Sequence, residues 1–490
     1  MDCETMKDRT DFPDRREIAT ALVPLVTLIG LVVLAVFVFG RDVGDGASQI
    51  SILLATAVAA LLARTVLGTP WSVLEQGIVK GVSSVTVSVF ILLLIGMLSG
   101  TWMICGTVPT LISYGVRLIR PDCFLVTATV VCALVALVTG TSWSTVATVG
   151  VALMGIGTAL GVSPLWSAGA IISGAYFGDK MSPLSDTTIL ASSSTRTDLF
   201  VHIRYMIQTT APSLLLSLAV FAAVGFCRSD VTAAADAGKC VAGLSTVFDL
   251  SPWTLVVPVV TIGLILLRVP SLAVLFASAL LAGGVALVLQ RPALLAAVGE
   301  TEPSAVNLYK AMMTVLFTST HLDTGDGMLN RLIATRGMAG MLGTIWLILL
   351  AAAFGGVMYA SGMLRTIARL VVSAIRGTVS MVGATAFTGV LMNAAMGDQY
   401  LSILVTADIF RDVYRERGYE SRLLSRTIED SSTVTSVLVP WNTCAMAQSA
   451  SLGIATVDYL PYCIFNLLSP ITTIVVAAIG KGIRRVRILV

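Results

Sequence analysis

Two carboxylates stand alone in long uncharged stretches of this sequence. Asp186 is the only charged residue between positions 181 and 195, and Asp398 is the only one between positions 377 and 407. An ionisable side chain in such apolar surroundings is costly unless it faces a cavity or a partner. A dehydrated carboxylate can hold either a proton or a metal cation, because burial disfavours its free charged form and a nearby cation restores it. We therefore interpret Asp186 and Asp398 as ion-binding residues.

Small polar residues surround both carboxylates. Their hydroxyl and amide oxygens are the groups that coordinate hard cations such as Na+ in place of water. The candidate neutral ligands are Thr141, Ser142, Ser185, Thr187, Gln399, Asn442 and Thr443. Asp430 is a further acidic candidate, since it precedes the uncharged stretch 431–457.

Three more charged residues near these motifs have two interpretations. Asp179 and Lys180 can belong to the site, or they can form an ion pair in a loop at the membrane surface. Glu429 can belong to the site, or it can cap the start of a helix together with Asp430, because acidic residues favour that end. The sequence leaves these alternatives open.

The polar motifs occur twice at a fixed offset. Residues 140–143 (Gly-Thr-Ser-Trp) correspond to 397–400 (Gly-Asp-Gln-Tyr), and the shift is 397 − 140 = 257. Residues 183–187 (Pro-Leu-Ser-Asp-Thr) correspond to 440–444 (Pro-Trp-Asn-Thr-Cys), and the shift is 440 − 183 = 257. The proline in each copy removes a backbone donor and favours a local break in a helix. A duplicated unit with polar breaks at membrane depth is typical of secondary transporters.

The composition is that of an integral membrane protein. Of 490 residues, 56% are hydrophobic and 12% are charged, whereas a soluble domain has about 25% charged residues. The apolar segments predict an all-α polytopic fold with about 11–13 transmembrane helices. Segments such as 164–178 and 400–410 are too short to cross a ~30 Å hydrocarbon layer as helices, so we expect broken helices or re-entrant hairpins there.

Charge and composition divide the chain into five parts. We expect a cytoplasmic N-terminal tail (1–17), a first transmembrane repeat (18–227), a linker (228–251), a second transmembrane repeat (252–480) and a basic C-terminal tail (481–490). Basic residues near both ends place the termini in the cytoplasm, and the arginine-rich segment 411–426 is interpreted as another cytoplasmic loop. Whether the repeats are inverted or parallel depends on the number of crossings in each, which the sequence does not fix.

Several other classes of protein are disfavoured. The eight cysteines are scattered without a CxxC motif and there are two histidines, so no metal cofactor is expected. The net charge of +3 is too small to indicate nucleic-acid binding. An intramembrane aspartyl protease could use Asp179 and Asp398, but neither lies in a GxGD motif and the chain has no Tyr-Asp pair. We therefore do not expect an enzyme.

The same motifs resemble those of the NhaC-type sodium/proton antiporters. The resemblance is carried by residues 140–145, 173–188, 397–402, 425–431, 440–444 and 465–470, and it extends over roughly 18–480. It implies an inverted-repeat ion transporter with paired hairpins, resident in the cell membrane, whose partners are lipid, Na+ and protons. One departure is Ile189, where such sequences often have asparagine.

The expected mechanism is competition between Na+ and a proton for a buried carboxylate. We expect Asp186 to be the main carrier and Asp398 its partner, and both ions to be cargo rather than cofactors. The alternative is a Na+/H+-coupled organic acid exchanger of the malate/lactate type, for which Lys180 is the only basic residue close to the polar breaks in sequence. Whether the protein forms a homodimer is left open.

Overall fold

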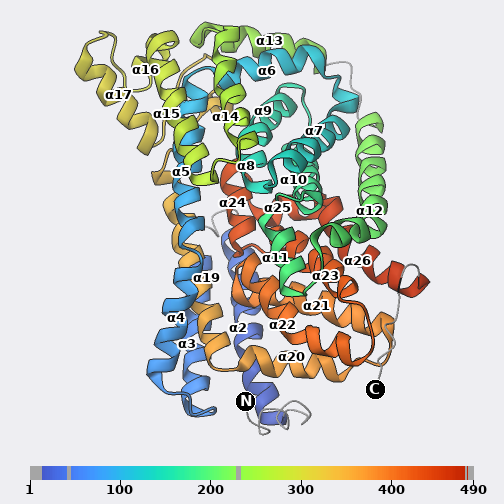
Figure 1. The fold of residues 1–490 in the computed structure, drawn as a ribbon. Coiled ribbons are helices and arrows are strands. Elements are labelled where there is room, and N and C mark those ends of the chain that lie inside the picture. The colour runs from blue at the N-terminus through green and yellow to red at the C-terminus, as the bar shows by residue number, and fades with distance from the viewer. Residues whose placement is uncertain (1–13, 41–45, 228–232, 481–482, 484–490) are drawn as a thin grey trace.

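The computed structural model describes residues 14–40, 46–227, 233–480 and 483, and its regular elements are helices (Figure 1). The predicted tails 1–17 and 481–490 lie almost wholly outside these residues. In the first half, helices run as α2 (Arg15–Phe39), α3 (Ala47–Thr65), α4 (Trp71–Ser84), α5 (Thr86–Ile104), α6 (Thr107–Leu118), α7 (Phe124–Thr139), α8 (Ser142–Thr145), α9 (Val151–Ala159), α10 (Pro164–Met181), α11 (Asp186–Ser194) and α12 (Leu199–Cys227).

The second half continues the pattern. Its helices are α13 (Ala233–Val247), α14 (Val256–Leu266), α15 (Ser271–Leu289), α16 (Arg291–Ala296), α17 (Ala305–Phe317), α18 (Gly327–Ile333), α19 (Leu342–Ala360), α20 (Met363–Ser373), α21 (Thr378–Met396), α22 (Gln399–Glu416), α23 (Ser421–Ile428), α24 (Thr443–Leu452), α25 (Thr456–Tyr459) and α26 (Ile464–Ile479). Two π-helical segments interrupt the α-helices, at Val146–Gly150 and at Glu429–Thr433.

The polytopic all-α class is confirmed. Among the described residues, nine helical segments are long and apolar enough to cross a membrane, and up to eleven if two bent helix pairs each count as one span. The bends are 91° between 238–247 and 252–266, and 57° between Thr456–Tyr462 and Ile464–Ile479. The predicted count of about 11–13 meets this range only at its lower end, because helices such as α10 and α22, with 18 residues each, are too polar to be counted as membrane spans.

The 257-residue offset extends to the helix ends. Gly140 ends α7 with φ 72°, and Gly397 ends α21 with φ 63°. Ser185 is the N-cap of α11, and Asn442 is the N-cap of α24. Because left-handed C-caps and polar N-caps are local features, the recurrence indicates that equivalent segments of the two halves fold alike.

Two amphipathic helices of the repeat lie at opposite ends of the bundle. Gly106 precedes α6 and Gly362 precedes α20, both with φ 79°, at a shift of 362 − 106 = 256. In Figure 1, α6 lies at the top and α20 at the bottom, close to the start of α2. This placement is what an inverted pair would give, and the inverted relation stays a prediction.

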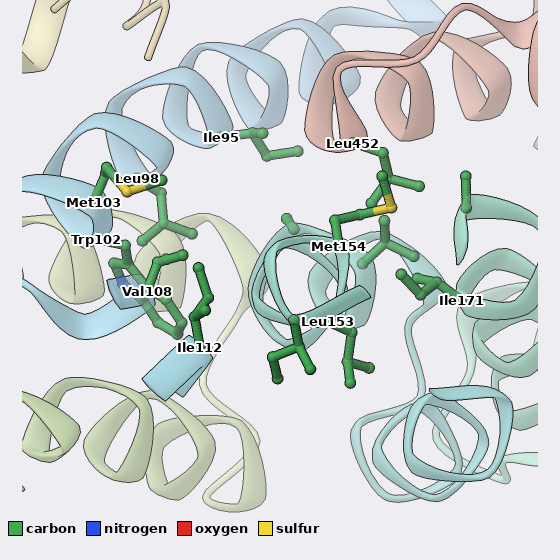
Figure 2. Close-up of a cluster of buried hydrophobic side chains, with 14 of the residues drawn as sticks. Ile95, Leu98, Trp102, Met103, Val108, Ile112, Leu153, Met154, Ile171 and Leu452 are labelled. Atoms are coloured by element: carbon green, nitrogen blue, oxygen red, sulfur yellow. The ribbon is translucent and has the colours of Figure 1, made fainter. Parts of the chain in front are cut away.

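Small residues let the central helices approach closely. A Cβ at Gly174 or Gly178 would come within 2.2 Å of backbone oxygens of α7, so α10 packs directly on that helix. Around this contact, Trp102, Leu153, Met154, Ile171 and Leu452 join α5, α9, α10 and α24 in one hydrophobic cluster (Figure 2). The cluster fixes the end of α10, which carries Asp179 and Lys180.

Candidate ion-binding site

A cavity of about 790 Å³ opens beside the duplicated motifs. It is lined from the first half by residues 139–144 and 184–187 and by Asp179, and from the second half by Gln399 and Tyr400. The fold therefore brings the glycine break and the proline break of the first half together with the glycine break of the second. Asp398, Asn442 and Thr443 do not line this cavity.

Asp179 is the buried carboxylate of the cavity wall, with an exposed fraction of 6%. Its Oδ2 accepts hydrogen bonds from the backbone N (2.9 Å) and the hydroxyl (2.7 Å) of Ser142. Its Oδ1 accepts a hydrogen bond from the Ser185 hydroxyl at 2.6 Å. Three donors offset the loss of hydration of the carboxylate. The breaks after α7 and before α11 thus both converge on Asp179.

The interpretation of Asp179 and Lys180 as a surface ion pair is wrong. Both residues are buried, and Lys180 forms its ion pair with Asp430 rather than with its neighbour. They lie in the last turn of α10, where successive side chains point to different sides of the helix. Asp179 faces the cavity and Lys180 faces the second half.

The expectation that Asp186 is dehydrated is also wrong. Asp186 is exposed and lines the cavity as the first residue of α11. Its side chain forms no hydrogen bond or ion pair with any residue that the structure describes. The inward position is taken by Ser185, which caps the helix by accepting a hydrogen bond from the Thr188 backbone N at 3.5 Å. A residue just after such a cap is turned away from the capping contacts, here towards the cavity.

Asp398 is buried, as expected, and serves as a helix cap. Its Oδ1 accepts a hydrogen bond from the backbone N of Leu401 at 2.9 Å, and its Oδ2 accepts one from the Thr443 hydroxyl at 3.4 Å. Asn442 caps α24 through the backbone N of Cys444 at 3.0 Å. These second-half residues hold the two breaks together behind the cavity.

The remaining neutral candidates divide between the cavity wall and the caps. Gln399 lines the cavity, where its amide donates to the Thr433 carbonyl at 3.3 Å and its Oε1 accepts from the Cys444 thiol at 2.7 Å. Thr141 also lines the cavity and caps α8 through the backbone N of Ser144 at 3.5 Å. Both side chains are therefore already bonded within the protein.

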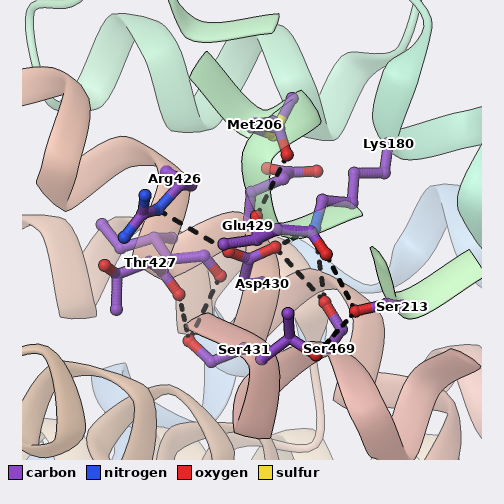
Figure 3. A network of polar contacts seen from close by, with 12 residues as sticks. Lys180, Met206, Ser213, Arg426, Thr427, Glu429, Asp430, Ser431 and Ser469 are labelled. Carbon is purple, nitrogen blue, oxygen red and sulfur yellow. Dashed lines mark hydrogen bonds and ion pairs between the residues drawn. The ribbon is translucent and has the colours of Figure 1, made fainter. Parts of the chain in front are cut away.

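Four charged side chains form a buried charge cluster behind the cavity: Lys180, Arg426, Glu429 and Asp430 (Figure 3). Lys180 Nζ is paired with Asp430 Oδ1, and Arg426 Nε lies 4.0 Å from Asp430 Oδ2. The interpretation of Glu429 and Asp430 as caps of a helix start is wrong, since they lie in the π-helical continuation of α23. Such π-helical turns are frequent at functional sites.

A chain of hydroxyl groups connects the cavity wall to the buried charge cluster. The Ser185 hydroxyl, bonded to Asp179, lies 3.0 Å from the Thr187 hydroxyl. Thr187 Oγ1 in turn donates to Glu429 Oε1 at 3.4 Å. The chain begins at a carboxylate of the first half and ends at one of the second.

Two arginines of the site were missed from the sequence. Arg268 lines the cavity and is exposed, with a φ of 60°. Arg426 was placed in a cytoplasmic loop, but it is fully buried and its guanidinium lies 4.7 Å from the centre of the Tyr205 ring. The loop interpretation of 411–426 is wrong because α22 and α23 occupy nearly all of that segment. The sequence does contain a signal for Arg268, because it is a basic residue at the end of an apolar run.

The fold and the site define a polytopic membrane transporter built on broken helices. A model of the Na+/H+ antiporter family matches residues 174–481. The chain is similar to the Na+/H+ antiporter NhaC of Bacillus subtilis (34% identity, covering 84% of this chain and 88% of the relative) and to that of Alkalihalophilus pseudofirmus (33%, 94% and 97%). It is also similar to the malate-2H+/Na+-lactate antiporter of Bacillus subtilis (32%, 89% and 90%).

The chain belongs to the Na+/H+ antiporter family, as the resemblance of its motifs indicated. It is a multi-pass membrane transporter and not an enzyme.

Proposed function

We propose that this protein exchanges Na+ for protons across the cell membrane, and that both ions compete for Asp179. The observation that carries the proposal is the position of this carboxylate. It lies on the cavity wall, is bonded by hydroxyl groups from both breaks, and has no basic side chain within 4 Å in the described part of the chain. An unpaired carboxylate of this kind needs a cation or a proton to neutralise it. The NhaC relatives support Na+ as the cation.

Counting hydrogens supports a single exchangeable proton. Three oxygen–oxygen contacts join Asp179 to Glu429 through Ser185 and Thr187. Each contact needs one hydrogen, and the two hydroxyl groups supply two. For all three contacts to be hydrogen bonds at once, a third hydrogen has to sit on a carboxyl group, at one end of the chain or the other. Moving it from end to end reverses the direction of all three hydrogen bonds.

This count gives a route to exchange. When Na+ binds in the cavity, Asp179 is ionised and the proton leaves the protein, either directly into the cavity or along the hydroxyl chain by way of Glu429. When Na+ leaves, a proton can neutralise Asp179 from the cavity or along the hydroxyl chain. Because one carboxylate cannot hold both ions well, the departure of one accompanies the arrival of the other.

Ion flux in proteoliposomes tests the proposal. Imposed gradients of Na+, K+ and organic acids are compared, and internal pH is followed with a dye. We expect Na+ to move protons in the wild type, Asp179→Asn to abolish that movement, and Asp186→Asn to keep a measurable part of it. Wild-type proton movement in Asp179→Asn would remove Asp179 from the mechanism.

A second candidate function, organic acid exchange, is favoured by one observation. Arg268 lines the cavity, and a guanidinium can bind a carboxylate with two parallel hydrogen bonds. Lys180, the basic residue first considered for this role, is paired with Asp430 away from the cavity. The malate–lactate relative supports this candidate. Counterflow of labelled malate that is lost in Arg268→Gln would establish it, whereas Na+-driven proton movement without any organic acid favours the first function.

A further inference from the structure

A second cavity, of about 320 Å³, lies between the end of α11 and the turn from α22 to α23. Three arginines line it: Arg196, Arg411 and Arg415. The only acidic residue of its lining is Glu420, which forms an ion pair with Arg422. The lining therefore holds three arginines and one glutamate, and the glutamate is paired with an arginine outside the lining.

Arg196 is held in a backbone conformation that suits glycine. Its φ is 56°, in the left-handed region that a residue with a Cβ rarely adopts. The equivalent position of the second half, 196 + 257 = 453, is Gly453 with φ 69°. The Arg196 side chain is exposed and forms no ion pair with any described residue. An unfavourable arginine where the fold accepts glycine suggests that its side chain has a function.

The other two arginines approach from α22. Arg411 Nε donates a hydrogen bond to the carbonyl of Ser194, the last residue of α11, at 3.0 Å. Arg415 lies one turn further along the same face and is 72% exposed. Each has an aspartate nearby on α22, Asp408 at 4.0 Å and Asp412 at 2.9 Å. Neither aspartate lines the cavity, so both arginines keep donors for an added anion.

The cavity lies at the basic end of the bundle. Just beyond it, Arg417 donates to the carbonyl of Ile375 at 3.2 Å, in the turn after α20. In Figure 1, α20 is at the end of the molecule where α2 begins. The distribution of basic residues makes this the cytoplasmic end. The adjacent leaflet surface there is anionic, and basic pockets between helices bind phosphate headgroups.

We propose that this cavity binds a phosphate-bearing anion, either a lipid headgroup or free phosphate. The anion joins Arg196 at the end of α11 to Arg411 and Arg415 on α22. Because α11 begins at the cavity that holds Asp179 and Asp186, an anion bound at its far end steadies the hairpin that forms the ion site.

The experiment measures stabilisation of the full-length protein by two probes, phosphatidylglycerol and inorganic phosphate. Thermal unfolding is followed in detergent after addition of either probe, and phosphatidylcholine is added for comparison. The test variant is Arg196→Gly, which removes the charge and suits the left-handed backbone, so it should fold. The control is Arg365→Gln, an exposed arginine on α20 at the same end but outside the cavity.

We expect phosphatidylglycerol to stabilise the wild type and Arg365→Gln, and Arg196→Gly to need an about fivefold higher concentration for the same shift. Stabilisation by inorganic phosphate as well would identify a free anion site, and stabilisation by phosphatidylglycerol alone would identify a lipid site. The proposal is overturned if neither probe stabilises the wild type, or if Arg196→Gly responds as Arg365→Gln does. Because the readout is binding, absence of Na+/H+ exchange would leave this result unaffected.

Discussion

Asp179 and Asp186 are seven residues apart (186 − 179 = 7), yet one is buried and the other is exposed to the same cavity. The difference follows from where a helix starts. Ser185 occupies the capping position of α11 and turns inward to Asp179, whereas Asp186 takes the next position and turns outward. Both residues are aspartates, so their burial is decided by their position relative to the start of α11 and not by their residue type.

The hydroxyl of Thr187 is the link between the halves, and Thr187→Val tests it. Valine has the same shape without the hydroxyl, so the chain from Asp179 to Glu429 is interrupted. We expect Na+-driven proton flux to fall about tenfold, the effect of losing one hydrogen bond. The measurement is the initial rate of internal pH change in proteoliposomes.

The control for this experiment is Thr187→Ser, which keeps a hydroxyl and should keep most of the flux. Exchange of labelled Na+ for unlabelled Na+ separates two roles of Thr187. If Thr187→Val slows this exchange as much as the proton flux, Thr187 is a sodium ligand rather than a proton relay.

Lys180 stabilises the fold by neutralising Asp430. Both side chains are fully buried, so Lys180→Met leaves Asp430 with the Ser469 hydroxyl at 3.3 Å and the more distant guanidinium of Arg426 at 4.0 Å. We expect a loss of about 3–5 kcal/mol in the free energy of unfolding, as for other broken buried pairs. Denaturant unfolding in detergent measures it.

The double variant Lys180→Met/Asp430→Asn should recover part of this loss, because it removes the carboxylate charge that Lys180 neutralised but also the ion-pair partner of Arg426. Equal stability of the single and double variants would show that Asp430 does not depend on Lys180.

At the scale of elements, the glycine break after α7 positions the hairpin tip. Gly140 has φ 72°, and a Cβ there would lie 2.7 Å from the carbonyl carbon of Leu184. Gly161 has nearly the same φ, 70°, but nothing lies within 4 Å of its Cβ position. Alanine at either site costs about 1–2 kcal/mol of backbone strain, so only the contact with Leu184 distinguishes them.

We expect Gly140→Ala to abolish transport, since Leu184 has to shift and Ser185 moves with it away from Asp179. Gly161→Ala should transport at nearly the wild-type rate with a slightly lower melting temperature. Flux and thermal unfolding of both variants check this. Similar transport in the two variants would show that the contact with Leu184 has no functional role.

The sequence predicted these elements well where local chemistry decides the structure. Left-handed glycines and polar caps recur at the 257-residue offset, so the breaks at Gly140 and Ser185 could be located before any coordinates were known. Burial could not be predicted in the same way. The burial of Arg426 depends on the ring of Tyr205 from α12, and the pairing of Lys180 depends on Asp430, 250 residues away.

At the scale of the whole molecule, the site lies where the two halves meet. Asp179, Ser185 and Thr187 come from the first half, and Glu429 and Asp430 from the second. Among the three contacts that join Asp179 to Glu429, the one between Thr187 and Glu429 is the longest, 3.4 Å, and it crosses between the halves. A relative movement of the halves would therefore make or break this contact first, which would link proton transfer to a change in access.

Inverted repeats are one architecture that produces such a movement, and labelling from the two sides of the membrane tests whether these repeats are inverted. Arg120 follows α6 and is 80% exposed, and Ser373 is the exposed last residue of α20. Each is changed to cysteine in a background without the eight native cysteines, and oriented vesicles are treated with a membrane-impermeant maleimide. If α6 and α20 are inverted counterparts, the two positions react from opposite sides, with Ser373→Cys on the side where α2 begins. Both should react equally once detergent opens the vesicles. Reaction of both from one side would show that the repeats are parallel, and their pseudo-twofold axis would then lie along the membrane normal rather than in the membrane plane.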